Sequence, residues 1–122
     1  ERGGVYMKEG RKIGDYIEDI IDAMTRAVEF VEGMSYNEFT KDIKTVYAVT
    51  RAIEIIGEAA KHIPNEIREK YSDIPWKNIA EMRDIIAHAY FGVNLKRIWE
   101  VIEKDIPPLK PKFERILEEL EE

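Results

Sequence analysis

Apolar residues recur every three or four positions along almost the whole of this 122-residue chain. This spacing gathers them on one side of an α-helix, whereas a strand would show strict alternation, and no alternating run stands out. The first such stretch spans residues 15–32 and carries its apolar side on Ile17, Ile20, Ile21, Met24, Val28 and Val31. With 44% hydrophobic and 36% charged residues, the composition suits a globular chain. The sequence therefore predicts an all-α fold.

Breaks in the pattern divide the chain into about five helices. Gly33 predicts a left-handed end to the first helix, and Ser35 followed by Glu38 has the form of a capping box. Short connections between long helices favour an antiparallel bundle. The expected helices are residues 15–32, residues 37 or 41 to 62, residues 75–90, one beginning after Asn94, and one beginning at Leu109 after an interruption at Pro107 and Pro108. Residues 65–71 are expected to form a short helical turn.

The second helix is apolar on two sides. Its main stripe contains Ile43, Val46, Tyr47, Val49, Ile53, Ile56 and Ile63. Its other stripe contains Ala48, Ala52, Ile55 and Ala59, which are mostly small. A helix with two apolar sides is expected to be central, with a close neighbour over the alanines.

Composition and the N-terminal sequence also indicate the extent of the domain and the location of the protein. Met7 resembles a natural start, so residues 1–6 are expected to be a non-native remnant or a disordered tail, and residues 7–122 a single helical domain. No apolar run approaches the roughly 20 residues of a membrane helix, and residues 1–6 show no apolar signal region. The absence of cysteine excludes disulfides and fits a cytoplasmic protein. Since the net charge is −6, any contact with RNA is expected to be local.

One segment points to chemistry rather than to packing. It carries Arg83 and Asp84, then His88 and Tyr90, in a chain with only two histidines. At about 100° per residue, Arg83, Asp84 and His88 share the helix face opposite the apolar side, around the small Ala87. Tyr90 lies at the edge of the apolar side by the same count. This face has room for a ligand or for a second copy of the helix.

An arginine and a histidine on one face are suited to RNA cleavage without a metal ion. Arg83 can hold a phosphate through its planar fork and stabilise the charge of the transition state. His88 can accept or donate a proton near neutral pH, and Asp84 can orient its imidazole. One arginine and one histidine supply few cationic groups for catalysis. Pairing two copies of the chain across a two-fold axis would complete the site. The structural alternative is an ordinary solvated or salt-bridged surface.

The segment resembles the Arg-x4-His-x-Tyr signature of HepT-like toxins, which belong to the HEPN superfamily of all-helical ribonucleases. Arg83, His88 and Tyr90 occupy the three signature positions, and Asp84 supplies the polar residue after the arginine. Residues 51–60, 74–77 and 99–107 are also similar to the family. The resemblance covers about residues 7–120, and it implies a HEPN-like helical bundle.

The resemblance further implies a homodimer whose motif helices form a composite RNA-cleaving cleft. It implies a type II-like toxin–antitoxin pair, in which a minimal nucleotidyltransferase transfers AMP from ATP onto Tyr90. Anionic adenylate beside Arg83 would occupy the phosphate site. No cofactor is implied. Two alternatives remain: a noncatalytic HEPN module that binds a nucleotidyltransferase or a nucleotide, and a purely structural dimer.

Other polar residues give weaker indications of a functional role. Arg51, Glu54, Glu58 and Lys61 form either an intrahelical ion-pair ladder or a polar stripe in which Arg51 or Glu58 lies beside the motif helix. His62 is expected at a helix end, where a cation suits the dipole. Lys96 and Arg97 are candidates for steering an RNA backbone. Two histidines without a matching ligand spacing predict no metal site.

Overall fold

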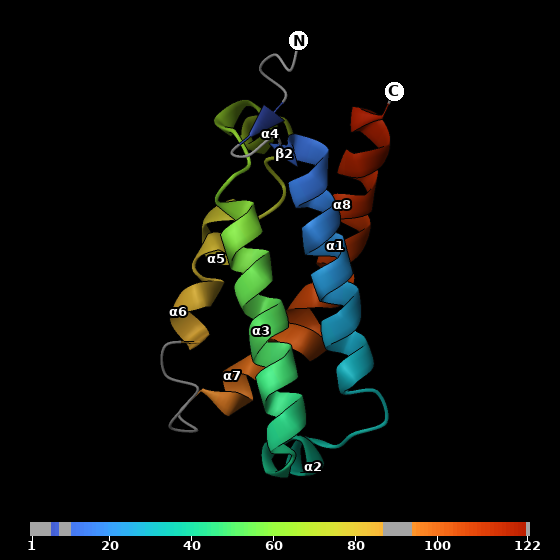
Figure 1. The fold of residues 1–122 in the computed structure, drawn as a ribbon, viewed down its shortest axis with the longest axis vertical. Coiled ribbons are helices and arrows are strands. Elements are labelled where there is room, and N and C mark those ends of the chain that lie inside the picture. Colours follow the sequence, from blue (N-terminus) through green and yellow to red (C-terminus); the bar gives the residue numbers. More distant parts are fainter. Residues whose placement is uncertain (1–5, 8–10, 87–93, 122) are drawn as a thin grey trace.

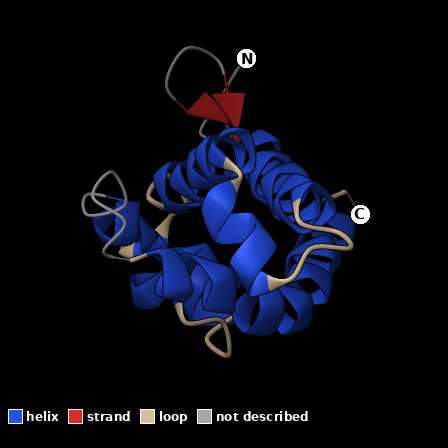
Figure 2. Cartoon of the chain, turned by 90° about the horizontal axis from the view of Figure 1, so that it is seen from below, coloured by secondary structure: helices blue, strands red, loops and turns tan. Residues whose placement is uncertain are grey.

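The computed structural model describes residues 6–7, 11–86 and 94–121, and this part of the chain is almost entirely helical (Figure 1). The all-α prediction is therefore confirmed, with one small addition. Two-residue strands β1 (Tyr6–Met7) and β2 (Arg11–Lys12) form an antiparallel pair before the first helix. Figure 2 shows this pair at one edge of the molecule, outside the group of helices.

Helix α1 (Ile13–Phe30) buries one face, as its apolar spacing predicts. Its start is fixed by Asp15, whose carboxylate accepts the Lys12 backbone N–H at 3.0 Å. The buried residues are Tyr16, Ile17, Ile20, Ala23, Met24 and Ala27. Val28, expected among them, is exposed instead. Gly33 has φ of +80°, which confirms the predicted left-handed turn after the helix.

The expected second helix is divided in two. Helix α2 (Tyr36–Lys41) begins with the predicted capping box: Ser35 Oγ accepts the Glu38 N–H at 3.1 Å, and Glu38 Oε1 accepts the Ser35 N–H at 2.9 Å. Asp42 then adopts an extended backbone and caps helix α3 (Ile43–Ala60), accepting the Thr45 N–H at 3.0 Å. An aspartate competes with the helix for backbone N–H groups, so it starts a new helix here.

The apolar side of α3 is narrower than its sequence predicts. Val49, Ile53 and Ile56 are fully buried, but Ile43 and Tyr47 point into solvent. The break at Asp42 sets the rotation of α3 on the core, and that rotation leaves the first two apolar residues of the helix outside. The expectation that Ile43 and Tyr47 belong to the core stripe is therefore wrong.

Helix α4 (Asn65–Lys70) confirms the short helical turn expected after Pro64. It also closes the end of α3. Arg68 donates from Nε to the Ile63 carbonyl at 2.9 Å and from Nη2 to the Ala60 carbonyl at 2.7 Å. Carbonyl groups at the end of a helix lack intrahelical donors, so a guanidinium placed there stabilises the end.

The last helical run passes through the prolines that were expected to interrupt it. Helix α7 (Leu95–Glu100) leads directly into a π-helical segment (Val101–Asp105) and then into α8 (Ile106–Leu120). Pro107 and Pro108 lie in the first turn of α8, directly after the π-helical segment. The predicted interruption is therefore wrong. The helical run continues past the prolines by way of the wider π-helical turn that precedes them.

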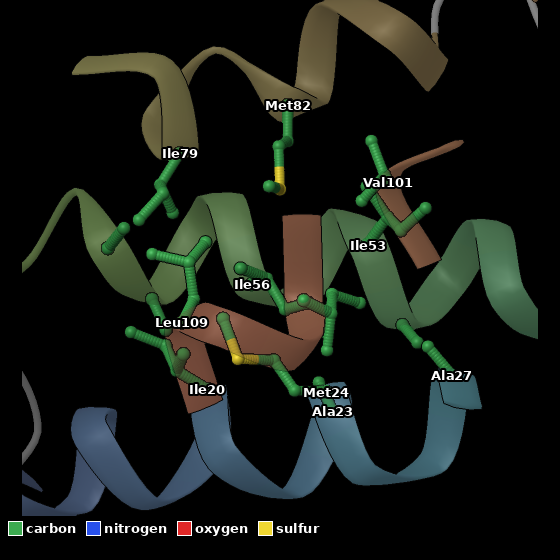
Figure 3. Packing of buried hydrophobic residues seen from close by; sticks show 14 of the residues in the cluster. Ile20, Ala23, Met24, Ala27, Ile53, Ile56, Ile79, Met82, Val101 and Leu109 are labelled. Carbon is green, nitrogen blue, oxygen red and sulfur yellow. The ribbon is translucent and has the colours of Figure 1, made fainter. Parts of the chain in front are cut away.

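The long helices pack side by side around one core. Helix α1 runs antiparallel to α3 and packs against α3 and α8, while α3 also contacts α2 and two short helices, α5 (Trp76–Ala80) and α6 (Met82–Ile86) (Figure 1). Figure 3 shows Ile20 and Met24 of α1 meeting Ile53 and Ile56 of α3 in this core. Among the described helices, none is both long enough and apolar enough to cross a membrane.

The burial of α1 gives a test of this packing. We expect Ile20→Ala, at a fully buried position, to lower the free energy of unfolding by about 2–5 kcal/mol because it leaves a cavity. The matched control is Val28→Ala in the same helix, where the side chain is exposed and the change should stay within about 0.5 kcal/mol. Urea denaturation followed by circular dichroism measures both, and equal losses would contradict the assigned inner face of α1.

Candidate functional site

The segment that carries Arg83 is bent rather than straight. The predicted helix from residue 75 to residue 90 is broken at Glu81, between α5 and α6. The Asp84 N–H donates to the Glu81 carbonyl at 2.8 Å, which closes a tight turn at this point. Since residues 76–86 contain neither glycine nor proline, the sequence gives no local sign of this break.

The bend is explained by the helix it packs on. A Cβ atom placed on Gly57 of α3 would lie 3.0 Å from Arg83 Cγ, 3.4 Å from the Arg83 backbone nitrogen and 3.5 Å from the Ala80 carbonyl oxygen. Both sides of the bend therefore rest on the one residue of α3 that has no side chain. Ile79, Met82 and Ile86 are buried on the inner side.

Arg83 lies at the outer side of this bend. Its side chain is 44% exposed, and its Nη2 lies 3.9 Å from Oε2 of Glu58 on α3. Asp84 is exposed on the same helix. The prediction that Arg83 and Asp84 face away from the core is confirmed.

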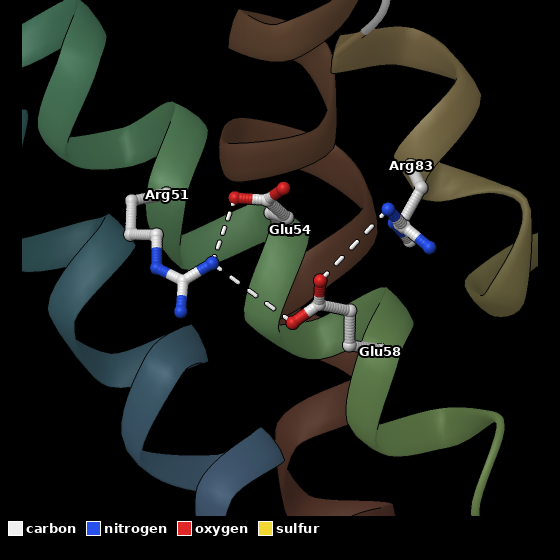
Figure 4. A network of polar contacts seen from close by, with 4 residues as sticks. All are labelled: Arg51, Glu54, Glu58 and Arg83. Atoms are coloured by element: carbon white, nitrogen blue, oxygen red, sulfur yellow. Dashed lines mark hydrogen bonds and ion pairs between the residues drawn. The ribbon is translucent and has the colours of Figure 1, made fainter.

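Glu58 joins Arg83 to a second arginine (Figure 4). Arg51 Nη1 lies 2.8 Å from Glu54 Oε1 and 3.9 Å from Glu58 Oε1. The hydrogen bond to Glu54 raises the pKa of the Arg51 guanidinium, and the Glu54 and Glu58 charges add to this effect. Such exposed pairs are worth about 0–1 kcal/mol each, so this network orients the side chains more than it stabilises the fold.

The contact between Glu58 and Arg83 answers one question that the sequence left open. The polar residues of α3 are more than an intrahelical ladder, because Glu58 reaches the helix that carries the motif arginine. What the sequence did not reveal is the role of Gly57. A glycine inside a helix is a weak sign of close packing, and it was the only such sign available.

His88 and Tyr90 lie within residues 87–93, outside the described residues, as does Ala87. Arg83 and Asp84 are the members of the predicted site that the structure places. Of the other candidates, Lys96 is exposed, and Arg97 is paired with Asp105 at 3.2 Å and with Glu100 at 3.8 Å.

His62 lies apart from the Arg83 site, just after the end of α3. Its ring stacks on the Tyr16 ring of α1, with the centroids 4.5 Å apart and the planes 11° from parallel. Arg11 lies over the Tyr16 ring at 4.6 Å and pairs with Asp19 at 2.8 Å. These contacts tie the start of α1 to the end of α3.

A groove of about 640 Å³ runs between α1 and α3. The small residues of α3 line it, including Ala48, Ala52 and Ala59. Ala52 and Ala59 are buried, which confirms that a close neighbour covers the alanines, and that neighbour is α1. Arg51 and Glu58 stand on its rim. Within the described ranges, no group of three or more His, Cys, Asp or Glu side chains is placed to hold a metal ion.

A partly exposed guanidinium can bind a phosphate group. Arg83 is one, on a turn that packs against Gly57, with Glu58 3.9 Å away. Among the described residues, Arg51 is the only other cation in this network.

Comparison with known proteins finds a matching family model and several similar proteins. A family model described as "Ribonuclease HepT-like" matches residues 20–116. A Thermococcus cleftensis protein described as "Probable ribonuclease HepT" is 46% identical over 110 residues, which cover 90% of this chain and 98% of that protein. A Caldanaerobacter subterraneus subsp. tengcongensis protein described as a "Putative RNase" is 48% identical over 103 residues, covering 84% and 92%.

A longer relative contains a similar segment as one of its parts. It comes from Methanocaldococcus jannaschii and is described as a "Gamma-glutamylcyclotransferase and putative RNase". The identity is 46% over 106 residues, which cover 87% of this chain and 48% of that protein. No solved structure matches the chain.

The Gly57 contact can be tested by comparing two glycines. Replacing a helical glycine by alanine normally stabilises a helix by about 0.5–1 kcal/mol. We expect Gly14→Ala to approach this gain, because the nearest atom to its new Cβ would be 3.9 Å away. Gly57→Ala should gain less or lose, since its methyl group meets Arg83 at 3.0 Å. Urea denaturation measures both, and an equal gain at the two positions would contradict the close packing at Gly57.

Proposed function

The chain belongs to the HepT-like ribonuclease family, and from this premise we propose that it is a metal-independent endoribonuclease whose catalytic residues are Arg83 and His88. The observation that carries the proposal is Arg83 itself. It is a partly exposed guanidinium, on a bend that packs closely against Gly57, at the first position of the family signature.

The two residues divide the chemistry between them. Arg83 binds the non-bridging oxygens of the scissile phosphate and stabilises the extra negative charge of the transition state. His88 takes the proton from the 2′-hydroxyl group as that oxygen attacks phosphorus, or gives a proton to the 5′-oxygen as its bond to phosphorus breaks. Asp84, four residues before His88, supports the imidazole.

The active form is a homodimer. One Arg83 and one His88 supply a single phosphate ligand and a single proton carrier, whereas cleavage needs both a base and an acid. A second copy across a two-fold axis doubles both groups and forms a composite cleft. Because the chain carries a net charge of −6, RNA is held locally at this cleft rather than over a broad basic surface.

The activity is that of a toxin controlled through Tyr90. A minimal nucleotidyltransferase antitoxin adenylylates Tyr90, seven positions after Arg83. The added adenylate is bulky and anionic, so it competes with RNA for the Arg83 guanidinium. Tyr90 is thus the point of control rather than a catalytic group.

Cleavage of a labelled RNA tests the catalytic roles. We expect Arg83→Ala and His88→Ala each to slow cleavage by roughly 10²–10⁴-fold, because they remove the phosphate ligand and the proton carrier. Arg115→Ala is the control, since Arg115 is an exposed arginine on α8. Circular dichroism checks that each variant is folded. Full activity in either motif variant would overturn the assignment.

Intact mass spectrometry with the cognate nucleotidyltransferase and ATP tests the control step. The wild type should gain the mass of one or more AMP groups and lose cleavage activity. Tyr90→Phe, which lacks the acceptor oxygen, should keep its mass and its activity. Modification of Tyr90→Phe would place the acceptor elsewhere, and partner binding without adenylylation or cleavage would point to a noncatalytic interaction module.

A further inference from the structure

A second concave surface, of about 340 Å³, lies between the bend of α5 and α6 and the last helical run. We call it the α5–α8 cleft. Its floor is apolar, because the buried side chains of Ile79, Met82 and Leu109 line it, and the exposed amide of Asn78 lies at its edge. An apolar floor with a few polar groups around it is the usual form of a site for a small group.

The polar residues of the α5–α8 cleft are mostly cations. Its described lining includes Arg97, Lys104 and Lys112, against the one carboxylate of Asp105. The chain as a whole is acidic, with a net charge of −6, so three cations around one cleft are a local exception. A concave surface with such cations on its rim attracts an anionic ligand.

Lys104 is the rim cation most open to a ligand. It is exposed, and within the described ranges it has no ion-pair partner. Arg97 pairs with Asp105 at 3.2 Å, and Lys112 pairs with Asp73 at 3.3 Å. Because such exposed pairs are worth about 0–1 kcal/mol each, a phosphate group can take the place of these carboxylates.

The backbone that carries Lys104 is also unusual. Lys104 lies on the π-helical segment between α7 and α8, and Asp105 of the same segment lines the cleft. A π-helical turn is rare and occurs often at functional sites. The least regular part of the last helical run therefore lies at the α5–α8 cleft, which is an independent sign that this surface has a function.

The α5–α8 cleft is next to the proposed active site. Met82, on the floor of the cleft, directly precedes Arg83 in the chain. Successive helical residues point about 100° apart, so Met82 is buried toward the cleft while Arg83 is turned to the outside. The two sites are thus separated by about the width of a helix, 10–12 Å. Stacked nucleotides rise about 3.4 Å each, so one strand reaches from site to site within about three nucleotides.

We propose that the α5–α8 cleft binds a nucleotide of the RNA substrate that flanks the scissile phosphate. The inference rests on the proposed function and adds a second contact with the same strand. The base lies on the apolar floor, where the Asn78 amide can donate to or accept from its edge, and Lys104 binds the phosphate. A nucleotide suits the cleft better than an acidic peptide does, because the proposed active site beside it binds the same strand.

Binding of uncleavable RNA of two lengths tests this proposal. A 2′-O-methyl group in place of each 2′-hydroxyl removes the attacking oxygen, so fluorescence anisotropy measures binding alone. We expect the wild type to bind an octanucleotide more tightly than a dinucleotide. Lys104→Glu should weaken binding of the octanucleotide by roughly tenfold and leave the dinucleotide nearly unaffected. Lys104→Arg, which keeps the cation, should bind as the wild type does.

A matched control separates the cleft from a general effect of charge. Lys44→Glu makes the same change at an exposed lysine of α3 that lines neither the α5–α8 cleft nor the groove between α1 and α3. Circular dichroism checks that each variant is folded. In Lys104→Ala the slope of log Kd against log salt should fall by about 0.7, the share of one phosphate contact on a single strand. Equal weakening by Lys44→Glu and Lys104→Glu would overturn the proposal.

Two other ligands are distinguished in the same assay. If AMP displaces the octanucleotide as well as unlabelled octanucleotide does, the cleft is a site for a free nucleotide. If polyglutamate binds through Lys104 more tightly than RNA does, the cleft is a site for an acidic protein segment. Either result would overturn the proposal.

Cleavage of an unmodified octanucleotide by the same variants separates this inference from the proposed function. We expect Lys104→Glu to raise KM and to leave kcat nearly unchanged, because Lys104 does not touch the scissile phosphate. If the wild type cleaves RNA and Lys104→Glu has an unchanged KM, the cleft is refuted and the nuclease stands. If the wild type binds RNA through Lys104 but does not cleave it, the nuclease is refuted and the cleft remains an RNA-binding site.

Discussion

The packing of α3 is the constraint on which the other elements depend. Its inner side is fully buried at Ile53 and Ile56, and the helix contacts α1 over its alanines and the α5–α6 bend over Gly57. Each neighbour takes its position from a different side of this one helix. The site follows from the same arrangement, because Arg83 lies where the chain bends across the only glycine of α3.

Gly57 lowers the intrinsic stability of helix α3 but allows the α5–α6 bend to pack closely against that helix. A glycine inside a helix is less favourable than alanine by about 0.5–1 kcal/mol, and α3 tolerates this because its stability comes mostly from burial. Because the Arg83 backbone packs against Gly57, its side chain lies near Glu58, the next residue of α3. A longer side chain at position 57 would move the Arg83 backbone away from α3, and the contact between Arg83 and Glu58 would then be lost.

The sequence predicted well what depends on local spacing. The apolar side of α1, the Ser35 capping box, the left-handed Gly33 and the outward face of Arg83 and Asp84 all follow from rules that act within one or two turns. The sequence-based prediction failed where contacts with other segments determine the local structure. The break at Glu81 depends on contact with Gly57, 24 residues earlier in the chain, and the passage through Pro107 depends on the preceding π-helical segment.

The pairing of Glu58 with both Arg83 and Arg51 has a thermodynamic consequence. Each of its two oxygens lies 3.9 Å from a different guanidinium, so the two arginines share one counter-ion. A phosphate that draws Arg83 away leaves the whole carboxylate to Arg51. By reciprocity, anything that tightens Arg51 on Glu58 makes Arg83 more available to an anion. The rim of the groove and the proposed phosphate site are therefore linked through the single side chain of Glu58.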